Sequence, residues 1–420
     1  MARRYFGTDG VRGVVGDLLT EELVARLGVA YGRWSGSESV LVGRDTRASG
    51  PDLERALARG LEASGSRVLS GGILPTPAVA LLAEESGAVI SASHNPPEYN
   101  GVKFFRRGWK LEDLEEEEIE ALLEDASGPG ADPPPRDGGA VCSARYVDLV
   151  CERFGRPLEG LRVVVDCANG AMYEVAPRVF ERLGAHVVTI GNRPDGANIN
   201  VGCGATDLSL LSRTVAEGDF HLGVAFDGDG DRVLGVDADG KNLDGDEILA
   251  ILALYLNVDT IAVTEMSNLG FHRLMEEHGI RVLTTAVGDR YVLEALRREG
   301  AKLGGEQSGH VLYLEGHTTG DGLVGALLLC RAVREEGASL RELADVLQKL
   351  PQAKADVEVR SKEISEPLRH EIEELAGEGR VVVRASGTEP VVRVLAEAET
   401  DEKAQALCGR IAALVSRELG

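Results

Sequence analysis

The feature that most constrains the fold is an alternation of short β-branched runs with amphipathic stretches, which recurs in three successive parts of the chain. The first part, residues 20–130, combines amphipathic stretches such as 21–34 with β-branched runs such as 39–42. The second part opens with the valine-rich run 161–166, and the third begins near the amphipathic stretch 247–256. Alternation of this kind predicts α/β units in which helices flank a sheet.

The pattern changes after Pro351, where three strand-like runs and two amphipathic stretches predict a small α+β domain. A run rich in glycine, proline and aspartate at 128–139 is typical of a linker. A chain of 420 residues is long for a single core, so we expect several domains. We predict three successive α/β domains of mixed sheet with flanking helices plus a smaller C-terminal α+β domain, bounded at 1–150, 151–244, 245–350 and 351–420.

Charge and cysteine usage narrow the class of protein. The formal net charge of −24 argues against nucleic acid or an anionic membrane as a partner, because both are bound by basic surfaces. The six cysteines are scattered without a CxxC pair, which favours reduced thiols in the cytoplasm. The N-terminus lacks the apolar stretch of a secretory signal, and no run approaches the roughly 18 apolar residues of a membrane span. We therefore expect a cytoplasmic protein without nucleic-acid or membrane partners.

Three aspartates at alternate positions, Asp227, Asp229 and Asp231, follow directly after an apolar run. Carboxylates spaced in this way on a glycine-rich loop can direct their oxygens at one hard cation, and they would repel one another without it. An EF-hand is excluded because Arg232 replaces the glycine at position six of the loop and Ala238 replaces the glutamate at position twelve. The loop therefore predicts a Mg²⁺ site with open positions for a phosphate oxygen.

A second polar segment, 91–105, also follows an apolar run and is interpreted as a loop. Its Ser93 is a candidate nucleophile or phosphate carrier, and His94 and Lys103 are near enough in sequence to supply hydrogen bonds and positive charge. A rigid Asn-Pro-Pro turn in which Ser93 only caps the backbone explains the segment equally well. The residues alone leave these two interpretations open.

Two further glycine-rich loops carry polar clusters. The loop 304–310 brings a carboxylate, an amide, a hydroxyl and an imidazole together, which suits the hydroxyls of a sugar. The loop 384–390, followed by Arg393, combines backbone amides, hydroxyls and guanidinium groups into a candidate phosphate cradle. Taken alone, the loop 304–310 is explained about as well by a hairpin with polar decoration. The alternative for 384–390 is an ordinary turn flanked by solvent-facing arginines, which is the more common fate of any single arginine, although a local cluster of cations is informative in so acidic a chain.

Together with the N-terminal run 6–13, these four loops stand in the order found in the α-D-phosphohexomutase family, which the chain resembles over essentially its whole length. Within that family, the loop 305–310, with Gln307, resembles the corresponding loop of the phosphoglucosamine mutases. Phosphomannomutase/phosphoglucomutases usually have methionine at the position of Gln307. The opening run 4–10 and the segment 198–206 also resemble the phosphoglucosamine mutase subgroup.

The resemblance implies an enzyme that interconverts glucosamine 6-phosphate and glucosamine 1-phosphate through a phosphoserine and a 1,6-bisphosphate. Such a reaction feeds the synthesis of UDP-N-acetylglucosamine and of the cell wall. The implied cofactors are Mg²⁺ and glucosamine 1,6-bisphosphate, or glucose 1,6-bisphosphate, as activator. The implied partner is a small hexosamine phosphate, and a homodimer is left open. A phosphomannomutase/phosphoglucomutase is the alternative within the same family.

The resemblance also implies roles for individual residues. Ser93 would carry the phosphoryl group and would hold Mg²⁺ together with Asp227, Asp229 and Asp231. The remaining implied site residues are Lys103 and His310 as acid/base candidates, Arg12 and Arg232 as added positive charge, His94, Glu306 and Ser308 as substrate contacts, and Arg384, Ser386, Gly387, Thr388 and Arg393 as the site of the phosphate that is not transferred.

Other classes of protein fit less well. A sugar-phosphate kinase should carry a nucleotide loop, but the near match to a Walker A loop at 235–242 ends in asparagine and is better explained as a hairpin turn. A phosphatase would share the metal loop but would let water take the phosphoryl group. A catalytically silent regulator that binds a sugar phosphate is disfavoured because Ser93 and the three aspartates are all present.

Overall fold

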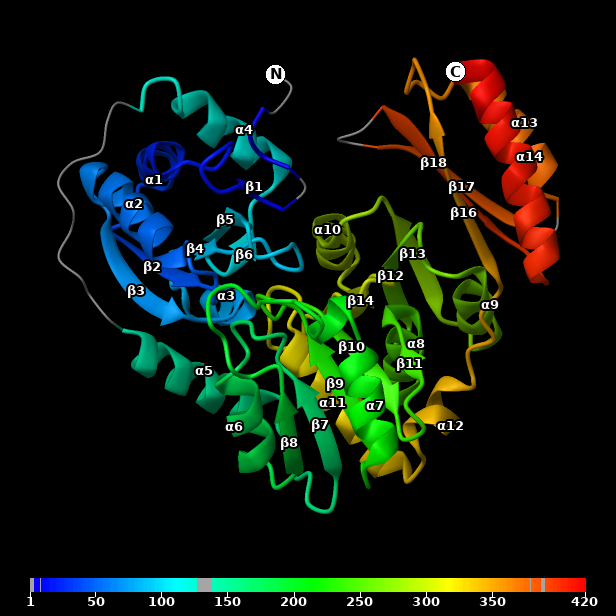
Figure 1. Ribbon diagram of the computed structural model, residues 1–420, viewed down its shortest axis with the longest axis horizontal. Helices are drawn as coiled ribbons and strands as arrows, with labels where there is room; N and C mark the ends of the chain where they lie inside the picture. The colour runs from blue at the N-terminus through cyan, green and yellow to red at the C-terminus, as the bar shows by residue number, and fades with distance from the viewer. Residues whose placement is uncertain (1–3, 8, 127–137, 378, 387–389) are drawn as a thin grey trace.

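The computed structural model describes residues 4–7, 9–126, 138–377, 379–386 and 390–420. Within these ranges four β-sheets follow one another along the chain, each with its own helices. Figure 1 shows them along an arc, from the first sheet in blue and cyan, through the green and yellow middle, to the fourth in orange and red. The predicted linker lies almost entirely outside the described residues. No helix in the described ranges is long and apolar enough to cross a membrane.

The first sheet is mixed and belongs to the first α/β unit. Its strands are β1 (Val11–Val14), β2 (Ser39–Arg44), β3 (Arg67–Ile73), β4 (Ser86–Ile90), β5 (Tyr99–Arg106) and β6 (Trp109–Lys110), and its helices are α1 (Glu21–Ser35), α2 (Gly50–Ala63), α3 (Thr76–Leu82) and α4 (Asp113–Leu122). The strand order is β3-β2-β4-β5-β1, and β6 pairs with β5. Strands β3, β2 and β4 are parallel, whereas β5 is antiparallel to both β4 and β1.

Alternation of side chains along the strands explains why helices cover both faces of this sheet. Val40 and Ile90 belong to the apolar cluster that includes α1 and α2, whereas Leu41 and Val89 belong to the cluster that includes α3. Successive residues of a strand point to opposite faces, so two buried faces require a nearly continuous apolar run. Because β2 and β4 are parallel, the segments that follow them leave the sheet at the same edge.

The second sheet carries the aspartate loop. Its strands are β7 (Arg162–Asp166), β8 (His186–Ile190), β9 (Leu222–Phe226), β10 (Val233–Asp237) and β11 (Asn242–Leu243), and its helices are α5 (Gly139–Arg153), α6 (Val175–Arg182), the short 3₁₀ helix η1 (Gly204–Thr206) and α7 (Ser209–Glu217). The strand order is β8-β7-β9-β10-β11, with β7 parallel to β8 and β9. The aspartates occupy the turn between the antiparallel strands β9 and β10. The run 235–242 forms the β10–β11 hairpin, which confirms the hairpin interpretation.

The third sheet carries the predicted sugar loop. Its strands are β12 (Thr260–Thr264), β13 (Arg281–Thr285), β14 (Leu303–Gly305) and β15 (Val311–Tyr313), and its helices are α8 (Gly245–Tyr255), α9 (Leu269–Glu277), α10 (Asp289–Glu299), α11 (Gly322–Glu336) and α12 (Leu340–Ala344). The strand order is β13-β12-β14-β15, and the predicted loop is the turn of the β14–β15 hairpin. Helix α8 begins with a capping box in which the side chains of Asp244 and Glu247 each bind the other's backbone amide.

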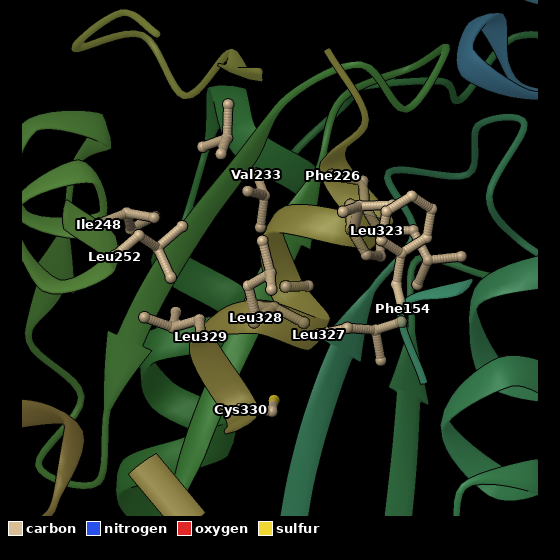
Figure 2. Close-up of a cluster of buried hydrophobic side chains, with 14 of the residues drawn as sticks. Phe154, Phe226, Val233, Ile248, Leu252, Leu323, Leu327, Leu328, Leu329 and Cys330 are labelled. Carbon is tan, nitrogen blue, oxygen red and sulfur yellow. The ribbon is translucent and has the colours of Figure 1, made fainter. Parts of the chain in front are cut away.

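Helix α11 connects the second and third units through their cores. Figure 2 shows Leu323 and Leu327 of α11 on the same side as Phe226 of β9, with Ile248 and Leu252 of α8 on the opposite side. All of these side chains are buried and belong to one apolar cluster, which also reaches into the first unit. The first three units therefore share a continuous core.

The fourth sheet is antiparallel and belongs to the C-terminal unit. Its strands are β16 (Gln352–Glu358), β17 (Arg380–Ala385) and β18 (Val391–Glu397) in the order β16-β18-β17, and its helices are α13 (Glu366–Ala376) and α14 (Asp401–Leu419). The two helices cover one face of the sheet and enclose an apolar cluster of their own, and Figure 1 shows both on the outer side of the molecule. Three α/β units and this α+β unit confirm the predicted fold class.

Candidate active site

Ser93 lies in the segment that joins β4 to β5 and is almost completely buried. Its hydroxyl donates a hydrogen bond to Oδ2 of Asp227, in the turn of the second sheet. Its Oγ also lies 3.4 Å from Nδ1 of His94. The backbone of Ser93 is left-handed, with φ of 51°, which is unusual for a residue with a side chain. The phosphoserine candidate and the aspartate loop are therefore brought into contact from different units.

The three aspartates converge as predicted. Asp227, Asp229 and Asp231 are all buried, and one carboxylate oxygen of each lies within 4.8 Å of the others. Burial, and next the charges of Asp231 and Asp229, raise the pKa of Asp227 to about 7. Oδ1 of Asp229 is buried and has no hydrogen-bond partner among the described residues. An all-oxygen donor set with an unused buried oxygen fits a hard divalent cation such as Mg²⁺.

Lys103 places an ammonium group against the same carboxylates. The whole segment 91–105 is predicted to be a loop, but its second half belongs to strand β5. Lys103 therefore lies on a strand and is fixed by the sheet. Its Nζ lies 2.8 Å from Asp229, 2.7 Å from Asp9 and 3.4 Å from Asp231. Burial alone would lower the pKa of Lys103, but these acidic neighbours hold the pKa well above its ordinary value. Arg12 also binds Asp9, so a second cation borders the cluster.

Two further charged residues extend this network, and sequence reasoning missed both. Nζ of Lys110 on β6 lies 3.0 Å from Oδ1 of Asp9 and 2.6 Å from Oδ2 of Asp289, the first residue of α10. All of these side chains are at least four-fifths buried. The alternating charges Asp289, Lys110, Asp9 and Lys103 thus connect the third unit to the aspartate loop through the first unit.

His310, on the β14–β15 hairpin, reaches the aspartate loop from the third unit. Its Nε2 lies 3.1 Å from Oδ1 of Asp231, and its Nδ1 lies 2.6 Å from Oε2 of Glu306. Burial lowers the pKa of His310, but the charges of Asp231 and Asp289 and the hydrogen bond with Asp231 together outweigh burial and raise the pKa to about 10. Nε of Arg232 lies 3.3 Å from Nε2 of the same imidazole. Burial, and next the charge of Arg232, lower the pKa of His94 to about 3, so this imidazole is neutral.

The two residues predicted to bind sugar hydroxyls have different surroundings. The carboxylate of Glu306 is held by His310 and by the backbone amide of Gly288 at 3.0 Å. Ser308 is exposed at the tip of the hairpin. Between them, Nε2 of Gln307 donates to Oδ2 of Asp246 at 3.3 Å. The loop thus offers an exposed hydroxyl beside a buried, oriented carboxylate.

The predicted phosphate cradle lies on the fourth sheet. Arg384 and Arg393 are partners on β17 and β18, and both line a cavity of about 610 Å³ together with Lys354 and with Met266 of the third unit. Lys354 is a further cation that sequence reasoning missed. The lining of this cavity includes none of the residues around Ser93. Ser386 is buried just beyond β17, and the predicted residues Gly387 and Thr388 lie outside the described residues.

Arg47 and Asn200 hold the backbone of the phosphoserine segment, and sequence reasoning assigned neither residue a role. The guanidinium of Arg47 is fully buried and donates to the backbone carbonyls of Ser93 and Asn95 at 3.0 and 2.8 Å. Its Nε donates to Oδ2 of Asp45 at 2.9 Å. Nδ2 of Asn200 donates to the same two carbonyls at 2.9 and 3.2 Å. Only the resemblance of segment 198–206 to a subgroup drew attention to Asn200 in the sequence.

This arrangement is suited to phosphoryl transfer. Such a transfer needs an oriented oxygen nucleophile, neutralisation of the phosphoryl charge and little covalent chemistry. Ser93 supplies the oxygen, the three aspartates supply a place for a cation, and Lys103, Arg12 and Arg232 supply positive charge at their border.

Comparison with known families gives one consistent result. Models of the phosphoglucomutase/phosphomannomutase family match four successive parts of the chain. They are alpha/beta/alpha domain I at 3–128, domain II at 144–240, domain III at 244–350 and the C-terminal domain at 329–414.

Similar proteins cover nearly the whole chain. It is 47% identical over 440 residues to the phosphoglucosamine mutase of Pelotomaculum thermopropionicum, covering 98% of both chains. It is 48% identical over 450 residues to that of Streptomyces griseus, covering 99% of this chain and 100% of the relative. Among solved structures, a phosphoglucomutase/phosphomannomutase family protein from Burkholderia thailandensis has a TM-score of 0.83 at 27% identity, covering 99% and 98% of the two chains. The N-acetylphosphoglucosamine mutase of Aspergillus fumigatus, in complex with GlcNAc-6P and magnesium, has a TM-score of 0.70 at 19% identity, covering 99% and 96%, which shows a shared fold.

Proposed function

The chain belongs to the phosphoglucomutase/phosphomannomutase family, and from this premise we propose that it interconverts glucosamine 6-phosphate and glucosamine 1-phosphate. The observation that carries the proposal is the hydrogen bond from the Ser93 hydroxyl to Asp227 inside the buried aspartate cluster. The choice of glucosamine is supported by relatives that are 43–48% identical and are named phosphoglucosamine mutases.

Asp227, Asp229 and Asp231 are the residues that would hold Mg²⁺, together with an oxygen on Ser93. Bound there, the cation would neutralise charge on the phosphoryl group during transfer. The fit is supported by the convergence of the three carboxylates and by the unpartnered buried oxygen of Asp229.

The resting enzyme carries a phosphoryl group on Oγ of Ser93. The C1 hydroxyl of glucosamine 6-phosphate attacks phosphorus, the bond between phosphorus and Oγ breaks, and glucosamine 1,6-bisphosphate forms. The hydroxyl loses its proton, and Oγ of Ser93 gains one. Lys103 and His310 are the acid/base candidates, since both side chains contact Asp231 at the centre of the cluster. Arg12 and Arg232 add positive charge around the transferred group.

The bisphosphate then turns around and returns its other phosphoryl group to Ser93, which releases glucosamine 1-phosphate. The phosphate that is not transferred needs one site that serves both orientations. We assign this site to Arg384 and Arg393, with Ser386, Gly387 and Thr388, and we add Lys354 because it lines the same cavity. His94, Glu306 and Ser308 would contact the sugar. Free glucosamine 1,6-bisphosphate, or glucose 1,6-bisphosphate, would restore enzyme that has lost its phosphoryl group.

We also propose a cytoplasmic enzyme whose partner is a small hexosamine phosphate, with neither nucleic acid nor membrane. The net charge of −24 supports this, and so do the six cysteines, all of which are free thiols. A homodimer stays open.

Turnover of glucosamine, glucose and mannose phosphates, each with and without 1,6-bisphosphate, tests the proposal. We expect the highest kcat/KM for glucosamine 6-phosphate and stimulation by bisphosphate. Preference for mannose or glucose phosphate would favour the alternative, a phosphomannomutase/phosphoglucomutase. Release of inorganic phosphate without isomerisation would indicate a phosphatase and would contradict both.

A further inference from the structure

Three loops from two units meet at the backbone carbonyl of Ser93. Nη2 of Arg47, from the first unit, donates to this oxygen at 3.0 Å, and Nδ2 of Asn200, from the second unit, donates to it at 2.9 Å. Gly228, between the first two aspartates, lies so close that a Cβ there would be 2.6 Å from the same oxygen. The carbonyl is therefore a fixed point shared by the phosphoserine segment and the aspartate loop.

The backbone of Ser93 needs such support because it is left-handed, with φ of 51°. Residues with side chains occupy this region at an energetic cost, and they persist there where the surroundings hold them. On the amide side, the backbone N–H of Ser93 donates to Oγ of Ser91 at 2.9 Å, and that hydroxyl donates to Asp45 at 2.6 Å. On the carbonyl side, the support comes from Arg47 and Asn200. Both peptide groups of the reacting residue are thus held.

Asn200 is the part of this support that comes from the aspartate loop's own unit. Its Nδ2 donates to the carbonyls of both Ser93 and Asn95, whereas its buried Oδ1 has no partner among the described residues. A reversed amide would direct Oδ1 at two carbonyl oxygens, which cannot donate a hydrogen bond. The two hydrogen bonds donated by Nδ2 therefore determine the orientation of the Asn200 amide. The loop of Asn200 is itself anchored to β7, because Gly204 N donates to Asp166 at 2.8 Å.

We propose that Asn200 is a positioning residue for phosphoryl transfer. By binding the carbonyl of Ser93 from the second unit, its amide fixes the serine Oγ relative to Asp227, Asp229 and Asp231. The role rests on the proposed function, since it presumes that Ser93 carries the phosphoryl group. Misplacement of a reacting atom by about 1 Å can cost about 10²-fold in rate, so a single lost donor has a measurable effect.

The test uses Asn200→Gly, because Asn200 is also left-handed, with φ of 59°, and glycine keeps that backbone while removing the amide. The control is Asn257→Gly, at an exposed left-handed asparagine after α8 with φ of 48°. Enzyme labelled with ³²P on Ser93 is mixed with excess glucosamine 6-phosphate, and the rate of label transfer is followed in a single turnover. KM and the melting temperature are measured on the same samples.

We expect Asn200→Gly to transfer label at least about tenfold more slowly, with KM and melting temperature unchanged, while Asn257→Gly matches the wild type. Asn200→Asp keeps the size of the side chain but turns a donor into a carboxylate oxygen, so we expect it to be slower still.

Equal rates for wild type, Asn200→Gly and Asn200→Asp would overturn the positioning role. A slower transfer that tracks a lower melting temperature and recovers on cooling would also overturn it, because the residue would then serve stability alone. Failure of the wild type to carry label on Ser93 would instead contradict the proposed function.

Discussion

Replacing Gly228 with alanine should slow catalysis because the new methyl group has no room. A Cβ at this position would lie 2.6 Å from the carbonyl oxygen of Ser93, 2.8 Å from Cδ1 of Ile199 and 3.0 Å from Nδ2 of Asn200. Ordinary contact begins near 3.4 Å, so the carbonyl of Ser93 or the aspartate loop must move by about 0.8 Å. The backbone of Gly228 is not left-handed, so the effect is steric.

The size of this shift sets the expected loss. A displacement of about 1 Å in a reacting group can cost about 10²-fold in rate. We therefore expect kcat of Gly228→Ala to fall by about 10- to 100-fold, which corresponds to about 1.4 to 2.7 kcal/mol of transition-state stabilisation. Overpacking should also lower the free energy of unfolding by about 1 to 3 kcal/mol.

The assay is steady-state turnover of glucosamine 6-phosphate at saturating Mg²⁺ and bisphosphate, at a temperature where circular dichroism shows the variant folded. Gly235→Ala is the matched control. It lies in the strand that follows the same turn, and its Cβ would meet its nearest neighbour at 3.5 Å. A folded Gly228→Ala variant with wild-type kcat would refute the argument that catalysis depends on the position of the Ser93 carbonyl relative to the aspartate loop.

Three further predictions address the cation, the distal phosphate and a buried acid. Asp229→Asn should lower kcat at least about 100-fold and raise the Mg²⁺ concentration for half-maximal activity, because a predicted metal ligand loses its charge; an unchanged magnesium titration would contradict this. Arg384→Met should raise KM for glucosamine 6-phosphate about tenfold with little change in melting temperature, and an unaltered KM would count against the cradle. Burial, and next the charge of Asp244, raise the pKa of Asp246 to about 7 in the folded state. The folded protein therefore holds this proton more tightly than the unfolded chain, and stability should fall as pH rises from about 4 through about 7. Asp246→Asn should lessen that loss in thermal melts, and identical pH profiles would show that Asp246 does not cause it.

The aspartate loop could be predicted because its chemistry is local. Three carboxylates within five residues, after an apolar strand, carry their own evidence for a cation, and the structure brings them together. The fold class was predictable for a similar reason, since each β-branched run and each amphipathic stretch is recognisable from its own residues, and their alternation along the chain indicates α/β units.

The charged network of Asp9, Lys110 and Asp289 could not be predicted. Lys110 and Asp289 are 179 residues apart, and neither position carries a local pattern that distinguishes it from a solvated charge. Their pairing depends on how α10 packs against the first unit, which only the tertiary structure determines. The same holds for Arg47, whose buried contacts lie 46 to 49 residues away in the phosphoserine segment.

The number of units and their sheets could be predicted from the sequence, but the way in which the units share an apolar core could not. The boundaries at 150, 244 and 350 stay predictions, because one apolar cluster runs through the first three units and α11 packs on sheets of two of them. Periodicity shows that a helix has an apolar face, but not which neighbouring sheet that face covers.

The most direct test of the account is the fate of the phosphoryl group on Ser93. Purified enzyme is first mapped by phosphopeptide mass spectrometry, then mixed with a substoichiometric amount of glucosamine 6-phosphate and analysed again. We expect phosphate on Ser93 and its loss from that residue in step with the appearance of glucosamine 1,6-bisphosphate. Phosphate on a different residue, or its release as inorganic phosphate without bisphosphate, would contradict it.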